Sequence, residues 1–124
     1  MDNCNLKYIL ENNLLSCKNI NFNYIGSEYI DINKYIIELI INNLINNILD
    51  NKYQYSIIAD NNCIIIENTN INTISNNYKS VLTDNLLNTS DSFIQELKLI
   101  IENIEGELII KNKNSILSKL ILIF

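Results

Sequence analysis

The chain contains no histidine, no proline and no tryptophan, and its 124 residues include only two glycines. Without histidine, the chain itself cannot accept a phosphoryl group on an imidazole. A zinc site is not expected either, because histidines and closely paired cysteines are its usual ligands. The three cysteines, Cys4, Cys17 and Cys63, are widely spaced, and we expect reduced thiols packed as small apolar side chains.

Basic residues are also scarce: nine Lys and Arg stand against 14 Asp and Glu, which gives a net charge of −5. Proteins that bind nucleic acids normally present a basic face, so we expect no nucleic-acid partner. The N-terminus has neither the basic start nor the apolar run of a signal peptide, and no apolar stretch approaches the length of a membrane span. We therefore expect a cytoplasmic protein with no membrane partner.

Hydrophobic residues make up 48% of the chain and charged residues 19%, which is typical of a globular domain, and the length predicts a single domain over residues 1–124. The spacing of apolar residues predicts helices over 6–15, 32–49 and 92–105, and strands over 20–24, 53–59, 62–68, 108–111 and 116–123. Residues 69–90 are polar and irregular, with a short helix near 79–87. This order predicts an α/β (α+β) two-layer sandwich, with about three helices on one face of a mixed sheet of about five strands.

Local signals place the ends of these elements. Asp31 is expected to cap the second helix, and Ser90 or Asp91 the third. Phe93 is expected to begin the buried stripe of the third helix, and Gly106 to adopt the left-handed conformation just past its end. Hairpin turns are expected at 60–62 and 112–114.

Two asparagines lie late in the second predicted helix, in the run Asn43-Leu44-Ile45-Asn46-Asn47-Ile48. One helical turn separates Asn43 from Asn47, so both point almost the same way, at the border of the apolar arc. A half-buried amide needs a partner, because an unpaired buried polar group costs about 1–3 kcal/mol. A nucleotide phosphate with its magnesium ion is one such partner, and backbone carbonyls or water are others.

The element order together with Asn43-Leu44-x-x-Asn47 resembles the ATP-binding domain of histidine kinases, the GHKL or Bergerat fold. The resemblance covers residues 18–124. It implies that Asn43 and Asn47 correspond to the N-box of that family, in which the second asparagine binds magnesium. Asn47 is thus the implied Mg²⁺ ligand, provided that a nucleotide binds.

Two other motifs of the family are altered in this chain. The family's Asp-x-Gly adenine motif corresponds to Glu67-Asn68-Thr69, so Glu67 stands for the aspartate, and Glu67 and Asn68 join the asparagine pair as vestigial nucleotide-binding candidates. The family's Gly-x-Gly lid has no counterpart, because no glycine occurs from Thr69 to Glu105. Glycine lets backbone N–H groups approach phosphates closely, so we expect no bound cofactor, with Mg-ATP as the alternative.

No catalytic residue is assigned. Hydrolases of the gyrase type carry a glutamate base one turn before the magnesium asparagine, and that position is Asn43 here. A further resemblance, to ChpT-type histidine phosphotransferases, rests on Tyr78-Lys79-Ser80-Val81-Leu82, on Phe93-Ile94-Gln95 and on the hairpin after Gly106. Their kinase-like domain has lost nucleotide binding, and their histidine-bearing helical hairpin is absent from this chain.

Three functions stay open. The first is a pseudokinase-like docking module in two-component or phosphorelay signalling, which is more in keeping with a non-enzyme. Its partner is a response regulator, a histidine kinase or a phosphotransferase protein. A homodimer is open as well. The second is an ATP-binding kinase domain that acts in trans on a separate histidine-bearing chain. The third is an inactive gene remnant.

Overall fold

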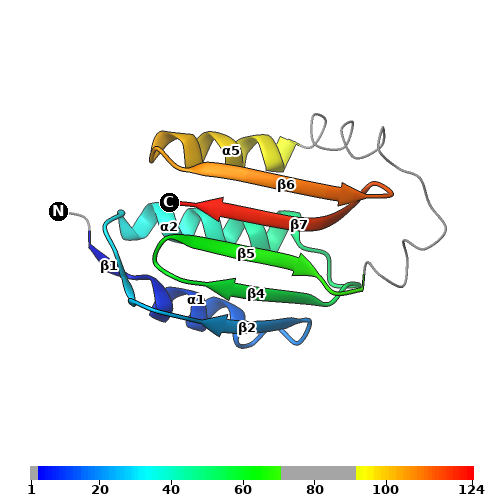
Figure 1. Ribbon diagram of the computed structural model, residues 1–124, viewed down its shortest axis with the longest axis horizontal. Helices are drawn as coiled ribbons and strands as arrows, with labels where there is room; N and C mark the ends of the chain where they lie inside the picture. Colours follow the sequence, from blue (N-terminus) through cyan, green and yellow to red (C-terminus); the bar gives the residue numbers. More distant parts are fainter. Residues whose placement is uncertain (1–2, 71–91) are drawn as a thin grey trace.

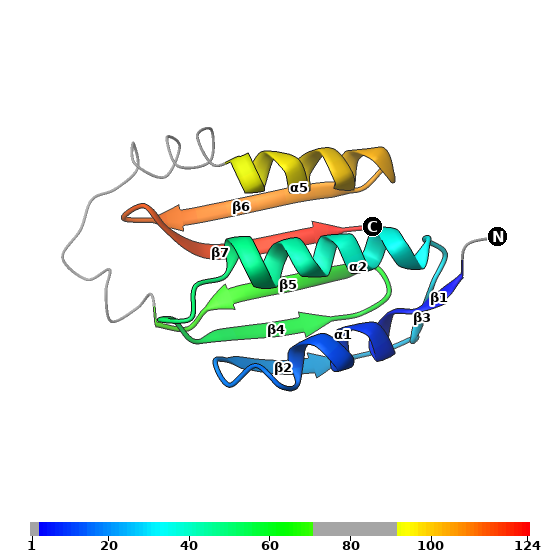
Figure 2. The same ribbon diagram turned by 180° about the vertical axis from the view of Figure 1, so that it is seen from behind.

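The computed structural model describes residues 3–70 and 92–124, and within them a five-stranded mixed sheet carries three helices on one face. The sheet lies in front of the helices in Figure 1, and the helices lie in front of the sheet in Figure 2, so no described helix lies over the second face of the sheet. The predicted two-layer sandwich is confirmed. The predicted short helix at 79–87, the caps Ser90 and Asp91, and the run 78–82 lie outside the described residues.

The helices are α1 (Leu6–Leu14), α2 (Lys34–Asn43), its π-helical continuation η1 (Leu44–Ile48), and α5 (Ser92–Asn103). The strands of the large sheet are β2 (Ile20–Tyr24), β4 (Tyr55–Ala59), β5 (Cys63–Asn68), β6 (Glu107–Lys113) and β7 (Ile116–Ile123), in the spatial order β2-β4-β5-β7-β6. The pair β2–β4 is parallel and the other pairs of this sheet are antiparallel. Two short strands that the sequence did not predict, β1 (Cys4–Asn5) and β3 (Tyr29–Ile30), pair as a separate sheet.

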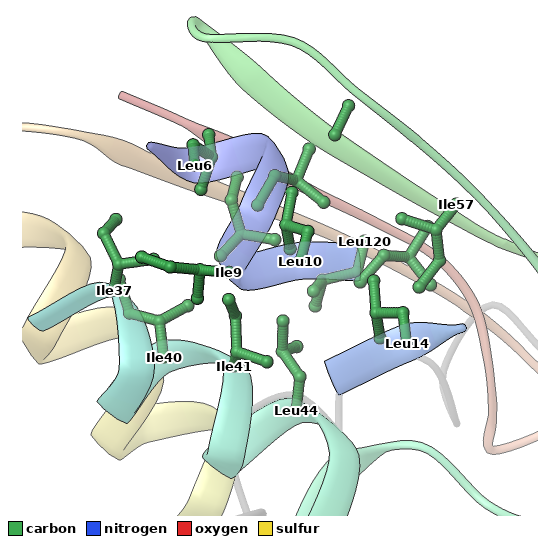
Figure 3. Close-up of a cluster of buried hydrophobic side chains, with 14 of the residues drawn as sticks. Leu6, Ile9, Leu10, Leu14, Ile37, Ile40, Ile41, Leu44, Ile57 and Leu120 are labelled. Carbon is green, nitrogen blue, oxygen red and sulfur yellow. The ribbon is translucent and has the colours of Figure 1, made fainter. Parts of the chain in front are cut away.

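The hydrophobic core fills the space between the helices and the sheet. Apolar residues at helical spacing point toward the sheet from both α1 and α2, as the sequence predicted. Figure 3 shows this contact, with Leu6, Ile9, Leu10 and Leu14 of α1 beside Ile37, Ile40, Ile41 and Leu44, and with Ile57 and Leu120 from the sheet. Each such side chain contributes about 1.5–3 kcal/mol when it is fully buried.

The N-cap of helix α2 lies two residues later than predicted. The Oδ1 of Asn33 accepts a hydrogen bond of 2.8 Å from the N–H of Tyr35, whereas Asp31 is exposed and caps nothing. The prediction that Asp31 caps this helix was wrong, because β3 holds the chain extended as far as Ile30 and the helix can start only after a further turn. Within the described residues, no helix is long and apolar enough to cross a bilayer.

The buried stripe of α5 is centred one residue later than predicted. Phe93 is 42% exposed, and Ile94 is buried together with Leu97 and Ile101. These three residues follow the i, i+3, i+7 spacing of one helix face, which leaves Phe93 at its border. Phe93 is therefore a surface residue at the start of α5.

The end of α5 also differs from the prediction. The left-handed residue is Glu105, with φ of 62°, and the N–H of Gly106 donates to the carbonyl of Ile101 over 2.9 Å. Gly106 is required for a different reason: a Cβ atom there would lie 2.3 Å from the carbonyl oxygen of Ile123 in β7. The close approach of two backbones, rather than a left-handed φ, therefore requires glycine at this position.

The closing hairpin turns at Asn114 and Ser115, not at 112–114. Both residues have positive φ, 54° and 64°, as a two-residue turn between antiparallel strands requires. Strand β6 therefore continues to Lys113, and a register shift between Lys111 and Asn112 accommodates the extra length.

We expect Gly106→Ala to lower the free energy of unfolding by about 1–3 kcal/mol, because the added methyl group must displace the backbone at Ile123. Denaturant unfolding followed by circular dichroism measures the change. The matched control is Glu105→Gly, which relieves a left-handed side chain and should change the stability by no more than about 1 kcal/mol. A loss in the control as large as that in Gly106→Ala would contradict the close-approach explanation.

Candidate functional site

The predicted asparagine pair lies where α2 changes into η1. The N–H of Leu49 donates to the carbonyl of Leu44 over 2.8 Å, five residues back, which is the π-helical hydrogen bond. Asn43 is buried, with 6% of its surface exposed, whereas Asn47 is exposed. Such π-helical turns widen a helix locally and are frequent at functional sites.

The amide of Asn43 is bonded at both ends within the chain. Its Oδ1 accepts a hydrogen bond of 3.2 Å from Nδ2 of Asn47, and its Nδ2 donates to the carbonyl of Phe93 over 3.4 Å. The second bond joins the end of α2 to the first turn of α5. Within the described residues, each polar atom of the Asn43 amide therefore has one structural partner, in α5 and in η1.

Asn47 is the more accessible of the two. Its Nδ2 is engaged with Asn43, and within the described residues its Oδ1 accepts no hydrogen bond. An amide oxygen is a suitable ligand for Mg²⁺, but that ion needs several oxygen ligands. Among the described residues, no cluster of three or more His, Cys, Asp or Glu side chains could hold a metal ion.

The end of β5 corrects the predicted adenine motif. Side chains alternate between the two faces of a strand, and Asn68, not Glu67, points toward the helices: Asn68 is 3% exposed, whereas Glu67 lies exposed on the open face. The structure therefore does not bring Glu67 together with Asn43, and Asn68 takes the inward position. The sequence run 63–66 is continuously apolar, so it could not indicate which residues face inward.

Asn68 is also bonded within the chain. Its Nδ2 donates to the carbonyl of Leu117 in β7 over 3.2 Å, and its Oδ1 accepts from the N–H of Asn70 over 2.9 Å. Like Asn43, it connects two elements of the fold. Figure 2 shows that the C-terminal ends of α2 and β5 lie at the same end of the domain.

A cavity of about 330 Å³ opens at this end of the domain, within the size range of small-molecule sites. It lies between η1, the start of β4, the start of α5 and the β6–β7 hairpin. Residues on its walls include Ile48, Tyr55, Ile94, Asn112 and Leu117. None of the three asparagines Asn43, Asn47 and Asn68 lines it, so the predicted site residues adjoin the cavity without converging on it.

The described walls of the cavity carry little positive charge. Among the described residues that line it, Lys52 is the only cation, and its ammonium lies 3.7 Å from the carboxylate of Asp50. The backbone N–H of Asp50 also donates to the hydroxyl of Tyr55 over 3.1 Å. Burial is the main reason why the pKa of Tyr55 is raised, so this phenol stays protonated at neutral pH. These walls suit an uncharged group better than a triphosphate.

The sequence gave no indication of two of the wall residues. Asn112 is buried, although it falls in a stretch predicted to be a turn, and Ile94 was overlooked in favour of Phe93. The alternation after Ile110 would have indicated that Asn112 points inward, if the strand had been predicted to continue that far.

No protein-family model and no curated protein sequence matches this chain. Solved structures do match it. The catalytic domain of histidine kinase ThkA in a nucleotide-free form is similar with a TM-score of 0.65 and 13% identity, over 97% of this chain and 91% of that one. A second nucleotide-free form of the same domain gives a TM-score of 0.58 at 13% identity, over 97% and 92%.

The cytoplasmic segment of histidine kinase QseC is similar as well, with a TM-score of 0.57 and 12% identity, over 98% of this chain and 72% of that one. At these identities the likeness concerns the fold alone. The chain therefore has the fold of histidine kinase catalytic domains, the GHKL-type ATPase fold.

We expect Asn68→Asp, which restores the carboxylate of the family's motif, to destabilise the fold by about 1–3 kcal/mol at neutral pH. An ionised carboxylate cannot donate to the carbonyl of Leu117, whereas a protonated one can. The loss should therefore be small below the ordinary aspartate pKa of about 3.9 and grow as the pH rises above it.

Unfolding in denaturant at several pH values measures this dependence. Asn21→Asp makes the same chemical change at an exposed strand position and should shift the stability by no more than about 0.5 kcal/mol. Equal losses in the two variants, or a loss that does not depend on pH, would contradict the role given to the Asn68 amide.

Proposed function

We propose that this chain is a histidine-kinase-like domain that docks onto another protein of a two-component or phosphorelay pathway in the cytoplasm and does not turn over ATP. Its partner would be a response regulator, a histidine kinase or a phosphotransferase protein. In this proposal the chain resembles the kinase-like domain of ChpT-type phosphotransferases. The observation that carries the proposal is that the inward amides of Asn43 and Asn68 are both bonded within the chain.

The residues at the kinase-like positions do not fit Mg-ATP. A ligand that used Asn43 or Asn68 would compete with the bonds that join α2 to α5 and β5 to β7. Glu67 lies on the far face of the sheet, and the one lysine among the described residues that line the neighbouring cavity is already close to a carboxylate. These observations support a domain without nucleotide. The chain also lacks the histidine that a phosphoryl donor needs, which supports a docking role over a shuttle of phosphoryl groups.

The groove between α5 and β6 is the surface that best supports docking. Its volume is about 500 Å³, and β6 is the edge strand of the sheet. Apolar side chains of both elements line the groove together with charged side chains, among them Ile94, Lys98, Leu99, Glu102, Leu108 and Ile110. Leu99 is 63% exposed, although it is large and apolar. Such side chains at a groove with a polar rim are typical of protein-binding surfaces.

The nucleotide-free proposal predicts no change in melting temperature when Mg-ATP is added. A ligand at one hundred times its dissociation constant would stabilise the fold by about 2.7 kcal/mol, which a thermal shift readily detects. The alternative, a kinase domain acting in trans, rests on the accessible Oδ1 of Asn47. A shift that is lost in Asn47→Ala, and kept in the control Asn46→Ala at an exposed neighbouring position, would establish that alternative instead.

The docking proposal predicts that the tagged chain co-purifies with a response regulator, histidine kinase or phosphotransferase from its host. Leu99→Glu should abolish this recovery, because a charge would enter the apolar part of the groove. Leu39→Glu is the matched control, since Leu39 is 50% exposed on α2, outside the groove. Recovery of none of these partner classes, or equal recovery with both variants, would contradict docking through α5 and β6.

A further inference from the structure

The open face of the sheet carries a row of apolar side chains. Four isoleucines lie side by side across four strands, because the strand registers pair Ile58 with Ile65, Ile65 with Ile121, and Ile121 with Ile109. We call them the isoleucine row. Their neighbours in sequence, such as Ile57, Ile64, Ile66 and Leu120, face the helices and form the core. None of the four belongs to that core, and no described helix covers them (Figure 1).

This pattern departs from that of an open sheet that faces water. Such a face normally alternates apolar inward residues with polar outward ones. Here the outward positions in the middle of β4, β5, β6 and β7 are all isoleucine, and Ile58 is 40% exposed. Charged groups stand in the rows on either side. The isoleucine row is therefore a contiguous apolar strip that favours burial against another surface.

The flanking rows differ in charge. On one side, the register aligns Ser56, Glu67, Lys119 and Lys111 across β4, β5, β7 and β6. On the other side, it aligns Cys63, Ile123 and Glu107 across β5, β7 and β6. The first row is thus acidic on β5 and basic on β7 and β6, whereas the centre of the other row is apolar.

We propose that the open face binds a second copy of this chain, through a two-fold axis that runs parallel to the strands between β5 and β7. Such an axis places β5 of one copy over β7 of the other, and each row faces the same row of the other copy. Glu67 of each copy then lies opposite Lys119 of the other. Ile65 meets Ile121, and Ile58 meets Ile109, so that the isoleucine row is buried along its length.

The charges favour this orientation over the other two-fold arrangement. An axis perpendicular to the strands would bring the two flanking rows together, with Glu67 over Cys63 and Lys119 over Ile123. Each charge would then face an apolar group of the other copy and keep only its cross-strand neighbour, whereas the axis along the strands gives each a second opposite charge.

This pairing produces four layers, with a helix layer on each outside and two sheets in the middle. The surface it uses is distinct from the cavity beside Asn68 and from the groove between α5 and β6, both of which lie on the helix side. The inference is therefore independent of the proposed function, and either can fail without the other.

Sedimentation equilibrium of the full chain over a range of concentrations tests the pairing. We expect a mass of twice 14.4 kDa at high concentration. Glu67→Lys and Lys119→Glu should each raise the dimer dissociation constant by roughly tenfold or more, because like charges then face each other across the interface. The double swap should restore the dissociation constant to within about threefold of the original, because the opposite charges are matched again.

The matched controls are Glu96→Lys and Lys34→Glu, which make the same charge changes at exposed positions on α5 and α2 and should not affect association. Circular dichroism verifies that each variant is folded. If the single swaps do not fold, Ile58→Lys takes their place, because its exposed position tolerates a charge and the variant should be monomeric. A chain that is monomeric at every concentration would overturn the proposal. So would a dimer that is indifferent to Ile58→Lys, or a double swap no tighter than the single ones.

Discussion

Strand β5 is paired on both edges, with β4 and β7, and this double pairing fixes which of its side chains face the helices. A shift by one residue would reverse every side chain of the strand. With the observed register, Ile64, Ile66 and Asn68 face inward and Ile65 and Glu67 face outward. The first group completes the core and supplies the polar residue at the end of the strand, and the second supplies the middle of the open face. One register therefore determines both surfaces.

On the helix side, the same asparagines that resemble a nucleotide site act as connections within the fold. Asn43 and Asn68 each make two hydrogen bonds in a buried place, so their amides do not remain unpaired there. The likeness to kinase catalytic domains lies in the arrangement of helices and strands.

The sequence predicted those features that depend on one regular period. The stripe of α1 and the alternation of β2 are unambiguous, and both elements lie where predicted. The errors arose where the sequence was compatible with two choices of which residues face inward. The apolar run before Glu67 does not reveal which residues face inward, and Phe93 and Ile94 both fit a helical stripe. Gly106 was assigned a left-handed φ because helix ends usually need one, although the contact that requires it comes from Ile123, which is remote in sequence.

The stability of a fold depends on whatever binds to the folded chain alone. A ligand that binds only the folded state stabilises it by RT ln(1 + [L]/Kd). Association through the isoleucine row of the open face would act through the same linkage, because only the folded chain presents the four isoleucines side by side. In that case the stability of the fold depends on the concentration of the chain itself.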